Sequence, residues 1–116
     1  MAELEYLPIA TAALIADTTH MSAEQFGAYV RLLIAMWRNG ARLADDQDEL
    51  AAIVGMDRRE WNRIAVVVLR PMTIAGGVVT QKRLTETWQR VQRTRKMRAV
   101  AGSRGAKKRW PLKGGR

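Results

Sequence analysis

Apolar residues recur at helical spacing in the first part of the chain, and the clearest case lies between Ser22 and Gly40. Ser22 with Gln25 three residues later forms a capping-box motif that predicts the start of a helix. Asn39-Gly40 predicts its end, because glycine suits the left-handed position after a helix. The apolar positions follow the i, i+3, i+4, i+7 pattern of one buried face: Phe26, Tyr29, Val30, Leu33, Ile34 and Trp37.

Two shorter helices are predicted next. One begins near Asp46, with Glu49 as its box partner, and ends at Gly55. Asp57 caps the other, with Glu60 three residues on. About two residues separate them, which is the spacing of a helix-turn-helix. The inward positions of the latter helix are Trp61, Ile64, Ala65 and Val68.

After Arg70-Pro71 the pattern changes from helical to extended. Met72–Ile74 and Val78–Thr80 are β-prone runs joined by Ala75-Gly76-Gly77, which predicts a hairpin. A helix, a helix-turn-helix and then a hairpin follow one another in a winged helix.

A last helix is predicted from Lys82, where the apolar stripe Leu84, Trp88 and Val91 gives way to Arg95. We expect it to leave the globule as a basic rod and then to become a chain too polar to fold alone. The predicted fold is mainly α with a small β-hairpin. A winged helix-turn-helix domain occupies residues 1–93, and a basic helix and flexible, Gly-containing arm occupy residues 94–116.

Charge divides the chain sharply. Residues 1–79 carry seven arginines against ten acids, a net −3, whereas residues 80–116 carry thirteen cations against Glu86 alone, a net +12. Eight of those thirteen cations are arginines, whose planar fork matches phosphate. A mildly acidic globule with a strongly basic arm is typical of a protein that binds nucleic acid. The alternative is a tail that only solubilises the protein.

Composition argues against catalysis and cofactors. Cysteine is absent and His20 is the single histidine, so we expect neither a metal site nor a nucleophilic triad. Gly102–Lys107 lacks the spacing of a phosphate loop, and the acidic run 45–49 lacks that of a calcium loop. No apolar run reaches the roughly 18 residues of a membrane span. We therefore expect a cytoplasmic protein of a bacterial cell that is not an enzyme, has no cofactor and does not associate with membranes.

The predicted contacts to nucleic acid lie on two elements. The first group lies on the outward face of the predicted helix that Asp57 caps: Arg59, Asn62, Arg63 and Arg70. Arginine and asparagine are the side chains that recognise guanine and adenine edges. An ordinary solvated face is the alternative there, and exposed Val66 and Val67 would instead favour a protein interface. Along the last helix and the arm the candidates are Lys82, Arg83, Arg90, Arg93, Arg95, Lys96, Arg98, Arg104, Lys107, Lys108, Arg109 and Trp110. Trp110 could stack on an unpaired base, or dock on protein.

Short motifs occur along the chain in this order: Tyr6-Leu7-Pro8, Ala16-Asp17-Thr18, Gly27-Ala28-Tyr29 with Leu32-Leu33, Trp37-Arg38-Asn39-Gly40, Asp45-Asp46, Arg59-Glu60-Trp61 and Lys82-Arg83-Leu84. Their joint order resembles the YdaU-like prophage family over residues 4–91. Residues 101–110 are similar to the Gly-rich basic ends of family members. The resemblance implies a winged-helix protein of phage or prophage origin, related to phage replisome organisers.

Two functions remain open at this point. One is a phage-type protein that binds DNA, expected to be double-stranded, in replication initiation or DNA regulation. The other is a phage-encoded inhibitor or adaptor that binds a host or phage replication protein through the winged-helix surface and the basic arm. A homodimer is compatible with either function, since helix-turn-helix proteins often pair.

Overall fold

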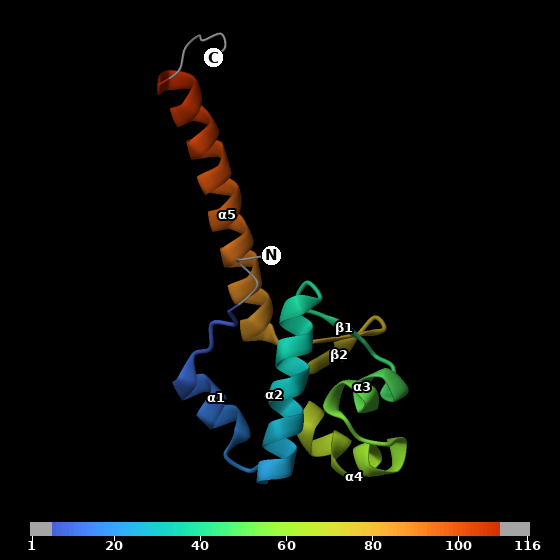
Figure 1. The fold of residues 1–116 in the computed structure, drawn as a ribbon. Helices are drawn as coiled ribbons and strands as arrows, with labels where there is room; N and C mark the ends of the chain where they lie inside the picture. Colours follow the sequence, from blue (N-terminus) through green and yellow to red (C-terminus); the bar gives the residue numbers. More distant parts are fainter. Residues whose placement is uncertain (1–5, 110–116) are drawn as a thin grey trace.

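The computed structural model describes the backbone of residues 6–109 and the side chains of residues 6–102. The chain is mainly helical, with one small antiparallel sheet (Figure 1). Its elements follow in this order: α1 Thr11–Thr18, α2 Ala23–Arg38, β1 Leu43–Ala44, α3 Gln47–Val54, α4 Arg58–Leu69, β2 Thr73–Ala75, β3 Val78–Thr80 and α5 Lys82–Arg109.

Helix α2 is the central element and begins at the predicted capping box. The Gln25 backbone N–H donates to Ser22 Oγ over 3.2 Å, and the Ser22 N–H donates to Gln25 Oε1 over 2.8 Å. The helix ends at Asn39, and Gly40 adopts the left-handed φ of +76° that the sequence predicted. Both ends of α2 are therefore fixed by local chemistry.

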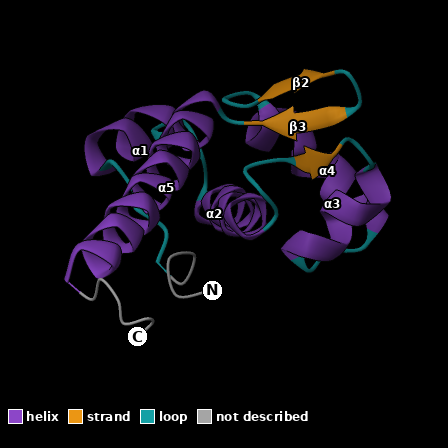
Figure 2. Ribbon diagram, turned by 90° about the horizontal axis from the view of Figure 1, so that it is seen from above, coloured by secondary structure: helices purple, strands orange, loops and turns teal. Residues whose placement is uncertain are grey.

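The buried face of α2 differs from the predicted one. Phe26 and Ile34 were expected in the core but are 38% and 46% exposed, and Val30 is only half buried. Helices pack against α2 from both flanks, so its buried face is centred on Leu32 and Met36 (Figure 2). The predicted pattern that started at Phe26 omitted these two residues. The residues actually buried are Ala28, Tyr29, Leu32, Leu33, Met36 and Trp37.

Helices α3 and α4 are capped as the sequence predicts. Asp46 accepts hydrogen bonds from the N–H groups of Asp48 and Glu49. Gly55 ends α3 at φ +79°. Asp57 and Glu60 form a complete capping box at the start of α4. Only one half of the predicted Asp46–Glu49 box is formed: the Asp46 carboxylate accepts from the Glu49 N–H, but the Glu49 side chain does not accept from the Asp46 N–H.

Trp61 lies on the inward face of α4 and is fully buried, as predicted. Its indole Nε1 donates to Gln47 Oε1 over 2.7 Å, which joins α4 to the first turn of α3. Ile64, Ala65 and Val68 complete the same buried face. The angle between α3 and α4 is therefore held by one large buried ring and one partly buried hydrogen bond.

The predicted hairpin forms between β2 and β3, with Gly76 and Gly77 at φ +60° and +77° in its turn. A third strand, β1, pairs antiparallel with β3 through Leu43↔Val79, giving the order β1-β3-β2. The sequence analysis missed β1, because two residues are too few to show an alternating pattern.

Helix α1 was also not predicted, since its short Ala-rich run shows no clear polar face. Helix α5 begins at Lys82 as expected but continues without a break to Arg109. A basic helical rod was expected to about Ala99 and a flexible, Gly-containing arm after it; the expectation of flexibility is wrong for residues 101–109, which are helical. Gly102 and Gly105 each disfavour helix by about 1 kcal/mol, but the surrounding Ala, Arg and Lys are strong helix formers. Residues 110–116 lie outside the described range.

Candidate nucleic-acid interface

The basic residues of α5 lie on a helix that projects from the globule. The described molecule measures 64 × 29 × 24 Å, and Figure 1 shows that its long axis runs along α5. Leu84, Trp88 and Val91 pack the base of the helix against the core. From Arg93 to Gly102 every residue is exposed except Arg95, which is half buried. This part of α5 is therefore open to a ligand from nearly all sides.

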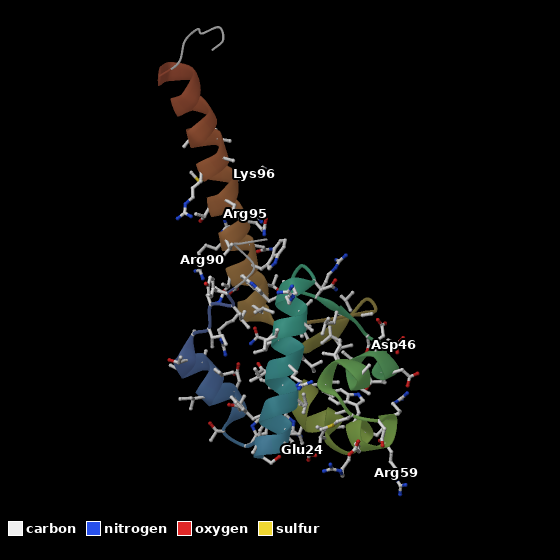
Figure 3. The ribbon with its side chains drawn as sticks, in the orientation of Figure 1. Glu24, Asp46, Arg59, Arg90, Arg95 and Lys96 are labelled. Carbon is white, nitrogen blue, oxygen red and sulfur yellow. The ribbon has the colours of Figure 1, made fainter. Side chains whose placement is uncertain are left out.

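Cations surround this rod. At about 100° per residue, Arg93 and Lys96 lie about 60° apart around the helix axis, and Arg98 lies about 140° from Arg93. Arg90, Arg95 and Lys96 follow one another along the rod in Figure 3. Glu86 is the only acid of α5 and lies within its first two turns. After Glu86 the sequence of α5 contains basic residues and no acid.

A groove of about 690 Å³ runs beside the rod. Trp88 is one of its lining residues, and its indole Nε1 is buried with no hydrogen-bond partner among the described residues. The groove therefore combines an aromatic surface with a cationic rim. Its lining residues are Trp88, Gln92, Arg95, Lys96, Arg98 and Ala99.

The first turn of α5 has a structural role. Gln81 is buried and caps the helix by accepting from the Leu84 N–H over 2.7 Å. Arg83 Nη2 donates to Asp17 Oδ2 over 2.7 Å and so attaches α1 to α5. Lys82 and Arg83 were both predicted as contacts, and both are exposed. Arg83, however, already forms an ion pair with Asp17.

The second predicted surface is the outward face of α4. Arg59, Asn62, Arg63 and Arg70 are all exposed there, as the helical spacing predicted. Val66 is 73% exposed between them, whereas Val67 is half buried. The predicted division of α4 into an inner and an outer face is thus confirmed, apart from the partial burial of Val67.

Two arginines of α4 already form ion pairs with acids of the protein itself. Arg63 Nη2 lies 2.9 Å from Glu24 Oε2 on α2, and this hydrogen bond and the carboxylate charge raise the pKa of the arginine. Arg58 donates to Asn62 Oδ1 and also to Asp48 Oδ1, over 3.0 and 2.9 Å. The sequence analysis missed Arg58, although its i, i+4 spacing to Asn62 could have indicated it. Arg59 is the cation of this face that points away from the globule (Figure 3).

The two predicted surfaces do not merge into one site. Figure 3 shows Arg59 at the end of the molecule opposite Arg95 and Lys96. The backbone of α5 includes Arg104, Lys107, Lys108 and Arg109, but their side chains lie outside the described residues. Trp110 lies outside them entirely.

A cleft of about 270 Å³ lies where α1, α2 and α5 meet. Its polar groups are already bonded to one another: Gln81 Nε2 lies 3.5 Å from Asp17 Oδ2 and 3.4 Å from the Tyr29 hydroxyl. Within residues 6–109, no group of three or more acidic, histidine or cysteine side chains could hold a metal ion. No helix in that range is long and apolar enough to cross a membrane.

Comparison with known proteins gives two matches. An uncharacterised Escherichia coli (strain K12) protein, YdaU, is 36% identical to this chain over 61 residues. Those residues are 53% of this chain but 21% of YdaU, so the match spans about a fifth of the relative's length. No solved structure matches significantly. A family model described as a protein of unknown function, DUF1376, matches residues 5–88. The chain therefore belongs to the DUF1376 family and has a distant YdaU-like relative.

Proposed function

We propose that this protein binds double-stranded DNA as a phage- or prophage-type factor in replication initiation or DNA regulation. Helix α5 supplies most of the affinity, and α4 with the β2–β3 hairpin forms a second, weaker contact. The order α2, β1, α3, α4, β2, β3 and the sheet order β1-β3-β2 support a winged-helix interpretation of the globule.

The single observation that carries the proposal is the basic rod. Helix α5 has 28 residues and is about 42 Å long at about 1.5 Å per residue, and the rod from Arg93 onward is about 26 Å long, less than one turn of duplex DNA. Each phosphate that a cation neutralises releases condensed counterions and so favours binding. A purely solubilising tail would need neither a fixed helix nor a majority of arginines.

The α4 face supports only a subsidiary role. Glu24 and Asp48 already neutralise two of its arginines, and Asp57 and Glu60 add negative charge at the start of the helix. Arg59 and Arg70 remain as exposed cations on this face. We therefore assign duplex affinity to α5 and treat α4 as the element that would add base preference.

The test is fluorescence anisotropy with a labelled 25-base-pair duplex, a matching single strand and increasing salt. We expect the protein to bind the duplex, and we expect the logarithm of the association constant to fall linearly with the logarithm of the salt concentration. The triple variant Arg93→Ala, Lys96→Ala and Arg98→Ala should weaken binding and flatten that slope by about two to three units. A double variant of uncharged, exposed residues on the same part of α5, Thr94→Ala with Met97→Ala, is the matched control and should leave both unchanged.

The exposure of Val66 supports a second candidate function. A β-branched apolar residue 73% exposed among polar neighbours is a common mark of a protein interface. In that case α4 would contact a host or phage replication protein, and the protein would act as an inhibitor or adaptor. Loss of a protein partner with Val66→Asp, together with no measurable affinity of the purified protein for DNA, would favour this second function.

A further inference from the structure

The surface of α2 that faces solvent carries an apolar seam. Ala23, Gly27, Val30 and Ile34 are separated by four, three and four residues, which is the spacing of a coiled-coil contact line. Ile34 is 46% exposed, and a Cβ built on Gly27 would meet no atom within 4 Å. Within the described residues, Ala23, Gly27 and Ile34 are exposed and Val30 is half buried.

Charged residues line one edge of the seam. Glu24, Arg31 and Arg38 are spaced seven residues apart, so they lie within about 40° of one another around the helix. The acid lies at the start of α2 and Arg38 at its end. This edge is therefore complementary to itself when a second α2 runs in the opposite direction.

We propose that this face of α2 is a self-association surface on which two copies of the chain pair with their α2 helices antiparallel. Ile34 of one copy then packs against Val30 of the other, and Gly27 allows the two backbones to approach closely. In the same register Glu24 faces Arg38 of the second copy. In a parallel arrangement this edge would lie on opposite sides of the seam in the two copies, so Glu24 and Arg38 would not meet.

The existing contacts of these side chains are compatible with the pairing. Glu24 Oε2 accepts from Arg63, but a carboxylate has enough lone pairs to accept from a second arginine. Arg31 lies near the two-fold axis, where it meets its own copy. Its Nη1 is 3.3 Å from the position a Cβ would take on Gly55, so its charge lies toward the carboxyl end of α3, which favours a cation.

The size of the seam sets the strength of the dimer. Helix α2 has 16 residues and is about 24 Å long, so the contact is smaller than a standard stable interface. We therefore expect a dimer that dissociates on dilution. Figure 2 shows α1 and α5 on one flank of α2 and α3 and α4 on the other, so α5 lies outside the seam.

Sedimentation velocity over a hundredfold range of protein concentration tests the pairing. The full-length chain should shift from monomer to dimer, and Ile34→Asp should weaken dimerisation by at least about tenfold, because it buries a charge in the seam. Ile15→Asp is the matched control: Ile15 is 67% exposed on α1, and its replacement should change nothing. Circular dichroism of both variants separates loss of pairing from loss of fold.

Orientation is tested by cross-linking, since the chain contains no cysteine. Arg31→Cys should give covalent dimers with a short bis-maleimide, whereas Ile15→Cys and Glu24→Cys should not. Cross-linking that is as efficient at Glu24 as at Arg31 would show a parallel pair and overturn the proposal. A chain that remains monomeric at the highest concentration, or a dimer that Ile34→Asp does not affect, would overturn it too.

Discussion

Arg63 on α4 reaches Glu24 in the first turn of α2, with 2.9 Å between the guanidinium Nη2 and the carboxylate Oε2. The two residues are 39 positions apart in sequence, so no local pattern reveals the pair. Both side chains are substantially exposed, and such ion pairs contribute little to stability. The pair instead determines how much positive charge α4 presents to a ligand.

Removing the acid should therefore expose the arginine. We expect Glu24→Ala to raise the affinity for duplex DNA severalfold at low salt, and Arg63→Ala to lower it, with almost no change in melting temperature for either. Anisotropy titrations at protein concentrations too low for pairing would measure both effects. If the two substitutions change affinity in the same direction, Arg63 is not a DNA contact.

Truncation separates the roles of the globule and the rod. Deleting residues 94–116 removes the exposed part of α5 but leaves Leu84, Trp88 and Val91 on the core, so the melting temperature should hardly change. If the deleted segment makes about five phosphate contacts, the salt dependence should become shallower by roughly four to five units. Unchanged affinity and slope would contradict the proposed role of the rod.

The sequence predicted the elements whose signals are local. Ser22 with Gln25, Asp57 with Glu60, and the glycines at 40, 55 and 76–77 mark helix ends and a turn through side chains a few residues away. The inner face of α4 was also predicted, because Trp61 heads a regular amphipathic pattern. Chemistry between neighbours in sequence is visible without a structure.

Features that depend on distant partners were not predictable in this way. The rotation of α2, which leaves Phe26 and Ile34 exposed, is set by packing from both flanks. Strand β1 exists only because Leu43 pairs with Val79. At the candidate interface the sequence identified the cations but not the acids that pair with them. Arg63 and Arg83, which form ion pairs, could therefore not be distinguished from Arg59 as contacts for a ligand.

Trp61 links the fold to the orientation of α4. It is fully buried, and its indole N–H is bonded to Gln47. Trp61→Ala should cost about 3–5 kcal/mol, much of the stability of a small domain, so DNA binding would fail through unfolding. Thermal melts followed by circular dichroism would measure the loss.

Trp61→Phe is the finer variant, because it keeps most of the ring and removes only the donor to Gln47. It should cost less than Trp61→Ala, with roughly 1–3 kcal/mol from leaving the buried acceptor without its partner. A Trp61→Ala protein that melts like the wild type would show that the ring does not hold α4 in place.

Tyr29 should make the stability of the fold sensitive to alkaline pH. Burial raises the pKa of its hydroxyl above the ordinary value of 10.0; the hydrogen bond from Gln81 opposes this rise, and the Asp17 carboxylate adds to it. The unfolded chain loses this proton near pH 10, whereas the folded chain retains it to higher pH. Above about pH 10 the unfolded state binds fewer protons, so the free energy of unfolding should fall as pH rises.

Below that range both states keep the proton, and Tyr29 should add no pH dependence. Urea denaturation at intervals between pH 8 and pH 11 would show the effect as a steeper alkaline loss of stability in the wild type than in Tyr29→Phe. Tyr6→Phe, on the exposed segment before α1, controls for the loss of a phenol and should behave like the wild type. Equal slopes for Tyr29→Phe and the wild type would mean that the Tyr29 hydroxyl is accessible to solvent in the folded protein.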